Sequence, residues 1–301
     1  MSKIGLLDID HHNYPNLAQM KLSAWHKAHG DDVEVYDGFS RYDRVYASKV
    51  FTSSPDWMEI INADEVVRGG TGYDCDKPLP DEVEHTMPDY SLYNITDTAY
   101  GFLTRGCPRH CPFCIVGDKE GTKSVKVADL SEFWSGQRNI VLNDPNILAC
   151  KDREDLLLQL KESRAWVDFN QGLDARLLDN DMCRLLADIR IKEIHFAWDN
   201  YHDGGKILPK LEMFARHSRL VHGHNAIVYV LTNYNTTHQQ DLERIYTLRK
   251  LGYWAYVMVY DKKNAPHITK KMQRWCNNRY IFAKCERFED YLTTTTKTAK
   301  L

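Results

Sequence analysis

The chain has 301 residues, of which 43% are hydrophobic and 27% are charged, a composition typical of a globular protein with one or two domains. Its formal net charge of −3 argues against a chain-wide basic field of the kind that binds nucleic acid. No apolar run approaches the roughly 20 residues that span a bilayer, and the N-terminus leads into a strand-like segment rather than a signal peptide.

The first 74 residues alternate between predicted strands and predicted helices. Hydrophobic periodicity predicts strands at 3–9, 33–36, 49–53 and 65–68, and helices at 17–29 and 57–62. This order predicts a small parallel α/β domain, Rossmann-like, with helices covering both faces of its sheet. Residues 75–98 are rich in proline and acidic residues, which indicates a linker.

A second alternation of strands and helices occupies residues 99–290. The predicted strands are 100–104, 139–142, 165–170, 193–198, 226–231 and 254–260, and the predicted helices are 127–137, 153–164, 181–189, 205–217 and 239–251. Six consecutive units are too few to close an eight-stranded barrel. The Thr- and Lys-rich tail, 291–301, is predicted to be disordered.

Three cysteines gather directly after the first strand of this second series, in the segment Cys107-Pro-Arg-His-Cys111-Pro-Phe-Cys114. Cysteine thiolates are the usual ligands of zinc and of iron–sulfur clusters. The other five are scattered, so the pattern indicates one metal site and unpaired cytoplasmic thiols rather than a disulfide framework. They are Cys75, Cys150, Cys183, Cys276 and Cys285.

Two alternatives for the cysteines stay open at this point. A closed tetrahedral zinc site would need a fourth ligand, and His110 is the nearest candidate in the sequence. Cys276 and Cys285 are too few to hold a second cluster by themselves, and the sequence leaves their redox or metal role undecided.

The spacing C-x3-C-x2-C, with Phe113 before the last cysteine, resembles the signature of the radical S-adenosylmethionine (SAM) superfamily. The resemblance implies a partial (β/α)6 TIM-like barrel in which Cys107, Cys111 and Cys114 hold a [4Fe-4S] cluster. The amino and carboxylate groups of SAM would chelate the remaining iron. An electron donor such as flavodoxin or ferredoxin would then drive cleavage of SAM to a 5′-deoxyadenosyl radical that acts on a small molecule, a peptide or RNA.

Polar residues follow each predicted strand of this series, at the edge where ligands bind in parallel α/β proteins. Asn143-Asp144-Pro145 is similar to the end of the family's Gly-Gly-Glu-Pro segment, which implies that Asp144 accepts a hydrogen bond from the SAM amino group; a helix N-cap is the alternative. Across the chain, the residues assigned to cofactor binding in this way are Phe113, Asn143, Asp144, Gln171, Asp174, Arg176 and Asp199.

Three of these residues carry more specific expectations. Asp174 and Arg176 are candidates for the ribose hydroxyls and the carboxylate of SAM, because a guanidinium binds a carboxylate bidentately. An Asp–Arg pair that ties a loop explains them equally well. Phe113 is expected beside the adenine.

Residues 1–74 resemble the cobalamin-binding domain that precedes some radical SAM barrels. Asp10 and His12 match the pattern Asp-x-His-x-x-Gly, but Pro15 stands where that pattern has glycine, and the domain is short. We therefore favour a reduced domain, used for packing or substrate shape, over a cobalamin site. The alternative functions are a cobalamin-dependent methyltransferase, an RNA-modifying enzyme and a zinc-binding interaction module.

A basic and aromatic stretch near the C-terminus, 262–287, has the residue types that bind phosphate and stack on bases. A solvated helix face is the alternative, and the negative total charge favours it.

Overall fold

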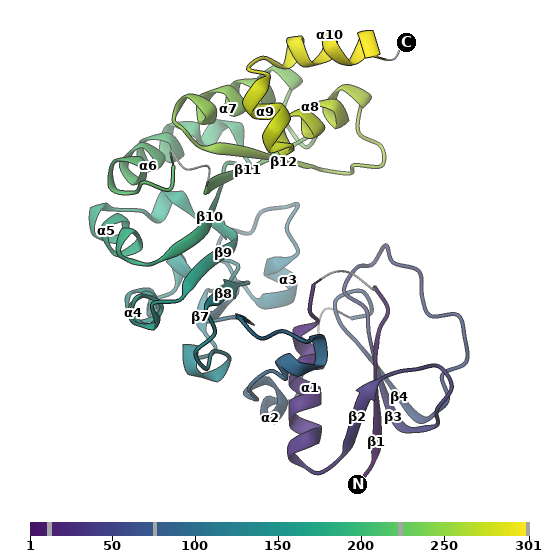
Figure 1. Cartoon of the computed structure of the whole chain (residues 1–301). Helices are drawn as coiled ribbons and strands as arrows, with labels where there is room; N and C mark the ends of the chain where they lie inside the picture. The colour runs from purple at the N-terminus through teal and green to yellow at the C-terminus, as the bar shows by residue number, and fades with distance from the viewer. Residues whose placement is uncertain (11–13, 75–76, 222–224, 299–301) are drawn as a thin grey trace. The chain divides into compact units, whose positions relative to one another are not determined.

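The computed structural model describes residues 1–10, 14–74, 77–221 and 225–298 (Figure 1). The chain divides into two compact units, Met1–Trp166 and Val167–Leu301. Both units contain parallel β-sheet accompanied by helices, so the predicted α/β class is confirmed.

The first unit begins with a four-stranded sheet in the order β2-β1-β3-β4, in which all neighbours are parallel. Helix α1, Leu17–Ala28, begins where the Asn16 side chain accepts a hydrogen bond from the Gln19 amide. Its residue Leu22 packs with Ile4 and Leu6 on one face of the sheet. The strands are β1 (Lys3–Asp8), β2 (Asp32–Val35), β3 (Tyr42–Ser48) and β4 (Ala63–Gly69).

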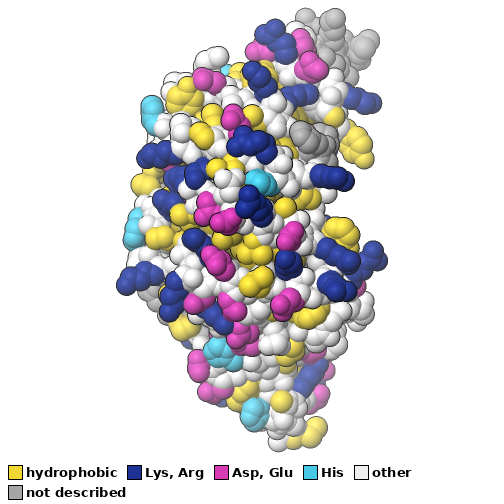
Figure 2. All heavy atoms as spheres, turned by 90° about the vertical axis from the view of Figure 1, so that its left-hand side faces the viewer, with side chains coloured by type: hydrophobic (Ala, Val, Ile, Leu, Met, Phe, Trp, Pro, Cys, Tyr) yellow, Lys and Arg dark blue, Asp and Glu magenta, His cyan; other side chains and the backbone are white. Residues whose placement is uncertain are grey.

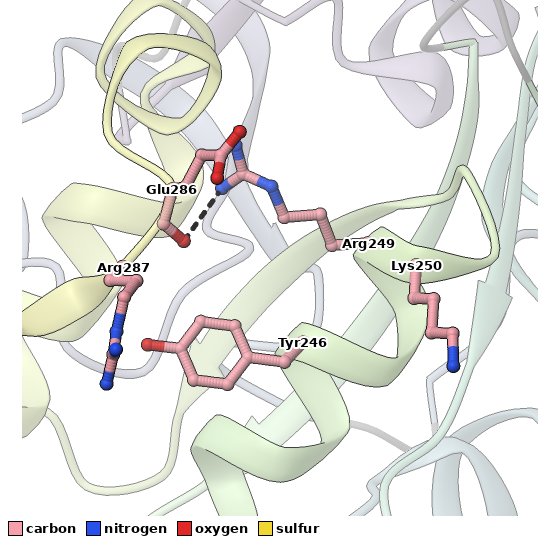
Figure 3. Close-up of a pocket in the computed structure, with 5 residues that line it drawn as sticks. All are labelled: Tyr246, Arg249, Lys250, Glu286 and Arg287. Carbon is pink, nitrogen blue, oxygen red and sulfur yellow. Dashed lines mark hydrogen bonds between the residues drawn. The ribbon is translucent and has the colours of Figure 1, made fainter.

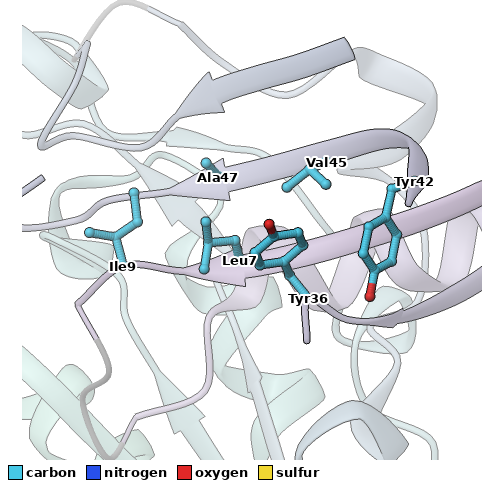
Figure 4. Close-up of a cluster of buried hydrophobic side chains, with 6 residues drawn as sticks. All are labelled: Leu7, Ile9, Tyr36, Tyr42, Val45 and Ala47. Carbon is cyan, nitrogen blue, oxygen red and sulfur yellow. The ribbon is translucent and has the colours of Figure 1, made fainter. Parts of the chain in front are cut away.

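The opposite face of this sheet carries a second apolar cluster, drawn in Figure 4. Trp57 and Ile61 pack against the cluster from a segment that has no regular structure. The helix predicted at 57–62 is therefore wrong, because the apolar spacing there serves an irregular cover. The cluster consists of Leu7, Ile9, Tyr36, Tyr42, Val45 and Ala47.

The third strand lies at Tyr42–Ser48 rather than at the predicted 49–53. The charged residues Asp43 and Arg44 interrupt the apolar alternation by which a strand is predicted. Both make contacts within the sheet: Asp43 accepts a hydrogen bond from the Lys3 amide, and Arg44 forms an ion pair with Glu65 on β4. The amides of residues 50 and 51 donate instead to the Asp10 carboxylate, which takes the chain out of the sheet.

The remainder of the first unit pairs β5 (Thr98–Gly101) in parallel with β8 (Asn139–Leu142), and β6 (Thr104–Arg105) in antiparallel fashion with β7 (Val125–Lys126). Short helices α2 (Asp81–Glu84) and α3 (Val116–Glu120) and the longer α4 (Arg153–Ser163) accompany them. Three 3-10 turns complete it: η1 (Tyr90–Tyr93), η2 (Leu130–Glu132) and η3 (Ile147–Ala149).

The helix predicted at 127–137 is wrong: this region contains only the turn η2. The Tyr90 hydroxyl donates to the Phe133 carbonyl, and the Phe133 ring lies where a side chain on Gly101 would stand, 2.4 Å from the position of its Cβ. These contacts hold the segment against β5, which local periodicity could not show.

The second unit contains β9 to β12 as neighbouring parallel strands, and Figure 1 shows α5, α6 and α7 along them. All four strands match the predicted positions to within about three residues. The strands are β9 (Trp166–Leu173), β10 (Ile191–Ala197), β11 (Ala226–Thr232) and β12 (Trp254–Val259). The helices and turns are η4 (Ala175–Leu177), α5 (Asn180–Asp188), η5 (Tyr201–Asp203), α6 (Gly204–His217) and α7 (His238–Lys250).

The chain continues through α8 (His267–Asn277), α9 (Arg279–Lys284) and α10 (Phe288–Thr298). Helix α10 covers most of the tail that was predicted to be disordered; residues 299–301 lie outside the described part. Its residues Phe288 and Tyr291 are buried, and Phe288 contacts Trp275 with ring centroids 5.5 Å apart. Aromatic anchoring therefore outweighs the low apolar content of the tail.

A fully buried arginine joins the ends of two strands in the second unit. Arg244 on α7 donates to the carbonyls of Trp198, Asp199 and Leu231 at 2.7, 3.0 and 2.6 Å. Its charge is balanced by Asp241, one turn away, at 2.6 Å. This pairing lets a cation satisfy carbonyls at the carboxyl ends of β10 and β11.

Replacing Asp241 by alanine is expected to lower the free energy of unfolding by about 3–5 kcal/mol, because Arg244 would keep its charge in a buried site without a carboxylate. Urea denaturation measures the change. Glu243→Ala, on the exposed side of α7, serves as the control and should cost less than about 1 kcal/mol. Equal losses in the two variants would contradict a buried ion pair.

Candidate functional site

The three predicted ligands lie in one loop of the first unit, residues 107–114, which we call the cysteine loop. It begins after Gly106, whose φ of +85° and close approach to the Lys123 carbonyl leave no room for a side chain. The Cys107 amide donates to the Gly121 carbonyl at 3.0 Å, and the Cys114 amide donates to the Cys111 carbonyl at 2.9 Å. The first bond joins the two flanks of the loop, and the second closes a turn within it.

The described cysteines form no disulfide. Cys107 and Cys111 are half-buried and Cys114 is exposed. Within the described ranges, no group of three or more His, Cys, Asp or Glu side chains is close enough to hold one metal ion. The donors themselves nevertheless suit a cluster, because three accessible thiols share one eight-residue loop.

An ion-pair network closes the ends of the cysteine loop. Arg105, just before the loop, donates to Glu120 at 2.6 Å and to Glu84 at 3.1 Å. Glu120 stands after the loop, at the end of α3, and its side chain is only 5% exposed. Lys21 of α1 also reaches Glu84, at 3.0 Å. Helix α1 and the start of the cysteine loop are therefore linked through ion pairs.

Asp144 stands directly after β8, as predicted, but its carboxylate is used by the chain itself. It accepts from the Leu103 amide at 3.1 Å, from the Thr104 hydroxyl at 2.7 Å and from the Thr104 amide. The residue is 3% exposed, and burial raises the pKa of its carboxyl to about 6. These bonds fasten the strand that leads into the cysteine loop.

Two details correct or complete the predictions at this strand end. The residue at the N-cap position of η3 is Asn146, so the interpretation of Asp144 as a helix N-cap is wrong. The Asn143 amide donates to the Gly101 carbonyl at 3.0 Å, which extends the pairing of β5 with β8 by one bond. Phe113 is half-buried within the cysteine loop.

The remaining predicted cofactor residues belong to the second unit. Asp174 and Arg176 form an ion pair at 2.7 Å, and Arg176 also binds Asp203 at 2.9 Å. The loop tie that the sequence suggested is therefore present. Gln171 is exposed within β9, and burial raises the pKa of Asp199 to about 6. Their roles toward SAM stay predictions.

Sequence reasoning missed three residues around the cysteine loop: Arg105, Glu120 and Asn146. Asn146 is 2% exposed, and its amide Nδ2 donates to the Cys107 sulfur at 3.4 Å. Only its place two residues after Asp144 could have drawn attention to it. Arg105 and Glu120 are 15 residues apart, and no local pattern links them.

Cys276 and Cys285 are engaged with backbone carbonyls, of Ala255 at 3.0 Å and of Arg287 at 3.1 Å. Burial raises the pKa of the Cys276 thiol well above its ordinary value. His12, which matches the cobalamin pattern, and Cys75 lie outside the described residues. No described helix is both long and apolar enough to cross a membrane.

Charged side chains of both signs share the surface of the molecule (Figure 2), and one surface pocket borders the basic stretch 262–287. Figure 2 shows a face on which Lys and Arg side chains are interspersed with Asp and Glu. A surface pocket of about 500 Å³ in the second unit, shown in Figure 3, is lined by basic and acidic residues together. Arg249 there donates to the carbonyls of Cys285 and Glu286, both at 3.3 Å. The lining residues are Tyr246, Arg249, Lys250, Glu286 and Arg287.

Comparison with known proteins gives little further information. No protein-family model and no curated protein matches the chain. Among solved structures, the chain is similar to Streptococcus suis SuiB, whose crystal structure holds the precursor peptide SuiA, with a TM-score of 0.42 and 11% sequence identity. The match covers 70% of this chain and 49% of SuiB, so the chain spans about half the length of that protein.

Acidity should stabilise the wild-type protein relative to an Asp144→Asn variant. The pKa of Asp144 is raised to about 6 in the folded protein from an ordinary value of 3.8, so between these values the folded state binds more protons than the unfolded state. Lowering the pH from 7 to 4 should therefore raise the unfolding free energy of the wild type relative to the variant by up to about 3 kcal/mol. Urea titrations at several pH values measure it, and parallel profiles would contradict the burial of the charge.

Replacing Arg105 by methionine should cost about 2 kcal/mol of unfolding free energy, because buried Glu120 loses its main cation. Arg41→Met is the matched control: its ion pair with Asp64 is exposed, with side chains 74% and 54% accessible, and should contribute under about 1 kcal/mol. Thermal or urea unfolding compares the two. A loss no larger than that of the control would show that Arg105 does not clamp the loop.

Proposed function

We propose that this protein is a radical SAM enzyme. The observation that carries the proposal is the cysteine loop, in which three thiols on an eight-residue segment are held between paired ends. Gly106, the Arg105–Glu120 ion pair and the Asp144 carboxylate all restrain the backbone on either side. A loop restrained in this way suits a cluster that must keep one iron open to a second ligand.

Cys107, Cys111 and Cys114 would hold a [4Fe-4S] cluster and leave one iron for the amino and carboxylate groups of SAM. When bound and reduced, by a donor such as flavodoxin or ferredoxin, this cofactor pair supplies a 5′-deoxyadenosyl radical. The chain's own share is to hold and orient. Asp144 positions the strand before the loop, and Phe113 offers an aromatic surface for the adenine.

Gln171, Asp174, Arg176 and Asp199, which the family resemblance also proposes for SAM, belong to the second unit. Arg176 is held by Asp174 and Asp203, which fixes the direction of its guanidinium. Burial raises the pKa of the Asp199 carboxyl to about 6, and this carboxyl is the proposed acceptor for a SAM hydroxyl. Gln171 offers an amide group in this unit, and Asn143 offers one in the first unit.

The proposed architecture is the partial (β/α)6 barrel over residues 99–290, preceded by a reduced cobalamin-domain-like unit over 1–74 and a connecting segment over 75–98. The four-stranded parallel sheet supports the second part of this proposal. In its order β2-β1-β3-β4, β2 lies on one side of β1 and β3 lies on the other, which is the switch point found in ligand-binding α/β sheets. We propose that this sheet serves packing or substrate shape, and that no cobalamin is required. The substrate is proposed only by class: a small molecule, a peptide or RNA.

Anaerobic reconstitution with iron and sulfide tests the proposal. The wild-type protein should take up about four iron atoms per chain, absorb broadly in the visible range and form 5′-deoxyadenosine from SAM when dithionite is added. Alanine at Cys107, Cys111 or Cys114 should abolish nucleoside formation and most of the iron.

Cys285→Ala is the matched control, because Cys285 is half-buried like Cys107 and lies in the other unit. It should retain the iron and the cleavage of SAM. A colourless protein that binds zinc through the same three cysteines would refute the proposal and support a zinc-binding interaction module instead. Nucleoside formation that survives all three alanine substitutions would refute it as well.

A further inference from the structure

Asn146 is a buried amide whose hydrogen bonds are not explained by the fold alone. Its backbone carbonyl accepts from the Ser124 hydroxyl at 2.8 Å and from the Ala149 amide at 3.1 Å, which fixes the segment after β8. Its side-chain oxygen Oδ1 is buried and has no hydrogen-bond partner among the described residues. Burying a polar atom without a hydrogen-bond partner costs free energy, so this arrangement indicates a function for the Asn146 side chain.

The position of Asn146 makes this arrangement more unusual. It precedes η3, where an asparagine ordinarily caps the first turn with its side-chain oxygen. Asn16, Asn200 and Asn278 do so elsewhere in this chain. Asn146 makes no such bond. Its side chain is turned instead toward the cysteine loop, where Nδ2 lies 3.4 Å from the Cys107 sulfur.

The orientation of the amide suits a thiolate better than a thiol. A thiol is a weak acceptor, whereas a negatively charged sulfur accepts a strong, charge-assisted hydrogen bond. With Nδ2 toward the sulfur and Oδ1 away from it, the positive end of the amide dipole faces the position where negative charge would develop. Asn146 is 2% exposed and Cys107 is half-buried, so the amide itself is shielded from water.

We propose that Asn146 is a positioning residue for the cluster, donating an N–H···S hydrogen bond to the Cys107 thiolate and thereby raising the reduction potential of the cluster. Hydrogen bonds to ligating sulfurs withdraw negative charge and favour the reduced state. The inference rests on the proposed function, and it adds to it a residue that sets how readily the cluster accepts an electron from its donor.

A potentiometric titration of the reconstituted full-length protein, followed by the electron paramagnetic resonance signal of the reduced cluster, tests the inference. Asn146→Leu keeps the branched shape of the side chain and removes the donor. At a fixed potential near the midpoint, its ratio of reduced to oxidised cluster should fall about tenfold, equivalent to ~59 mV for one electron. Its iron content should match the wild type.

Ser124→Ala is the matched control, since it removes a bond to the Asn146 backbone and leaves the side chain and its donor in place. Its midpoint potential should stay at the wild-type value. If Asn146→Leu and Ser124→Ala have the same midpoint, the inference is overturned. Should Asn146→Leu fail to fold, Asn146→Asp replaces the donor with an oxygen at the same place and should shift the midpoint in the same direction; an unchanged midpoint again overturns it.

A second measurement needs no cluster and separates this inference from the proposed function. In the iron-free protein, the rate at which iodoacetamide alkylates Cys107, followed by peptide mass spectrometry, reports the reactivity of its sulfur. Loss of the donor in Asn146→Leu should slow the reaction roughly tenfold relative to Ser124→Ala. If the reaction is slower in Asn146→Leu but the protein binds no iron, the hydrogen bond is supported and the proposed enzyme function is refuted. Equal rates would refute the hydrogen bond whatever the iron content.

Discussion

The arrangement of the first unit depends on how the strand before the cysteine loop is held. Leu103 and Thr104 direct their amides at the Asp144 carboxylate, which stands at the end of the neighbouring strand in a site with 3% exposure. Burial of that carboxylate is unfavourable and raises its pKa to about 6, and the three donors offset part of this cost. The result is a rigid connection between β8 and the start of the loop, made by a charge rather than by apolar contact.

Around this connection the loop is enclosed by partners that come from distant parts of the sequence. Arg105 and Glu120 join its two ends, Glu84 and Lys21 extend the ion pairs to helix α1, and Asn146 reaches Cys107 from the segment after β8. Such a shell is what a metal-binding loop requires, because ligands hold their geometry only when their own surroundings are fixed. The proposed cluster and its proposed tuning both follow from the same set of contacts.

The second unit also uses charged side chains to hold the backbone at its strand ends. Each of its strands β9 to β12 is followed within two residues by an Asp or Asn, and Arg244 donates to carbonyls at the ends of β10 and β11 while Asp241 balances its charge. Arg176 is likewise held by two carboxylates, Asp174 and Asp203. In both units, then, buried or half-buried charges position the backbone at the strand ends where a parallel sheet presents its ligands.

The amino-acid sequence by itself determined the cysteine spacing, the parallel α/β class and all four strands of the second unit, because hydrophobic periodicity and ligand spacing are local properties. It misplaced β3 and predicted helices at 57–62 and 127–137, where apolar residues pack from irregular segments. Only the tertiary structure decided that the Asp144 carboxylate is bound by the chain, that Arg105 reaches Glu120, and that Asn146 faces Cys107. Those contacts join residues 15 to 40 positions apart, and hydrogen bonds over such separations exist only once the strands have packed.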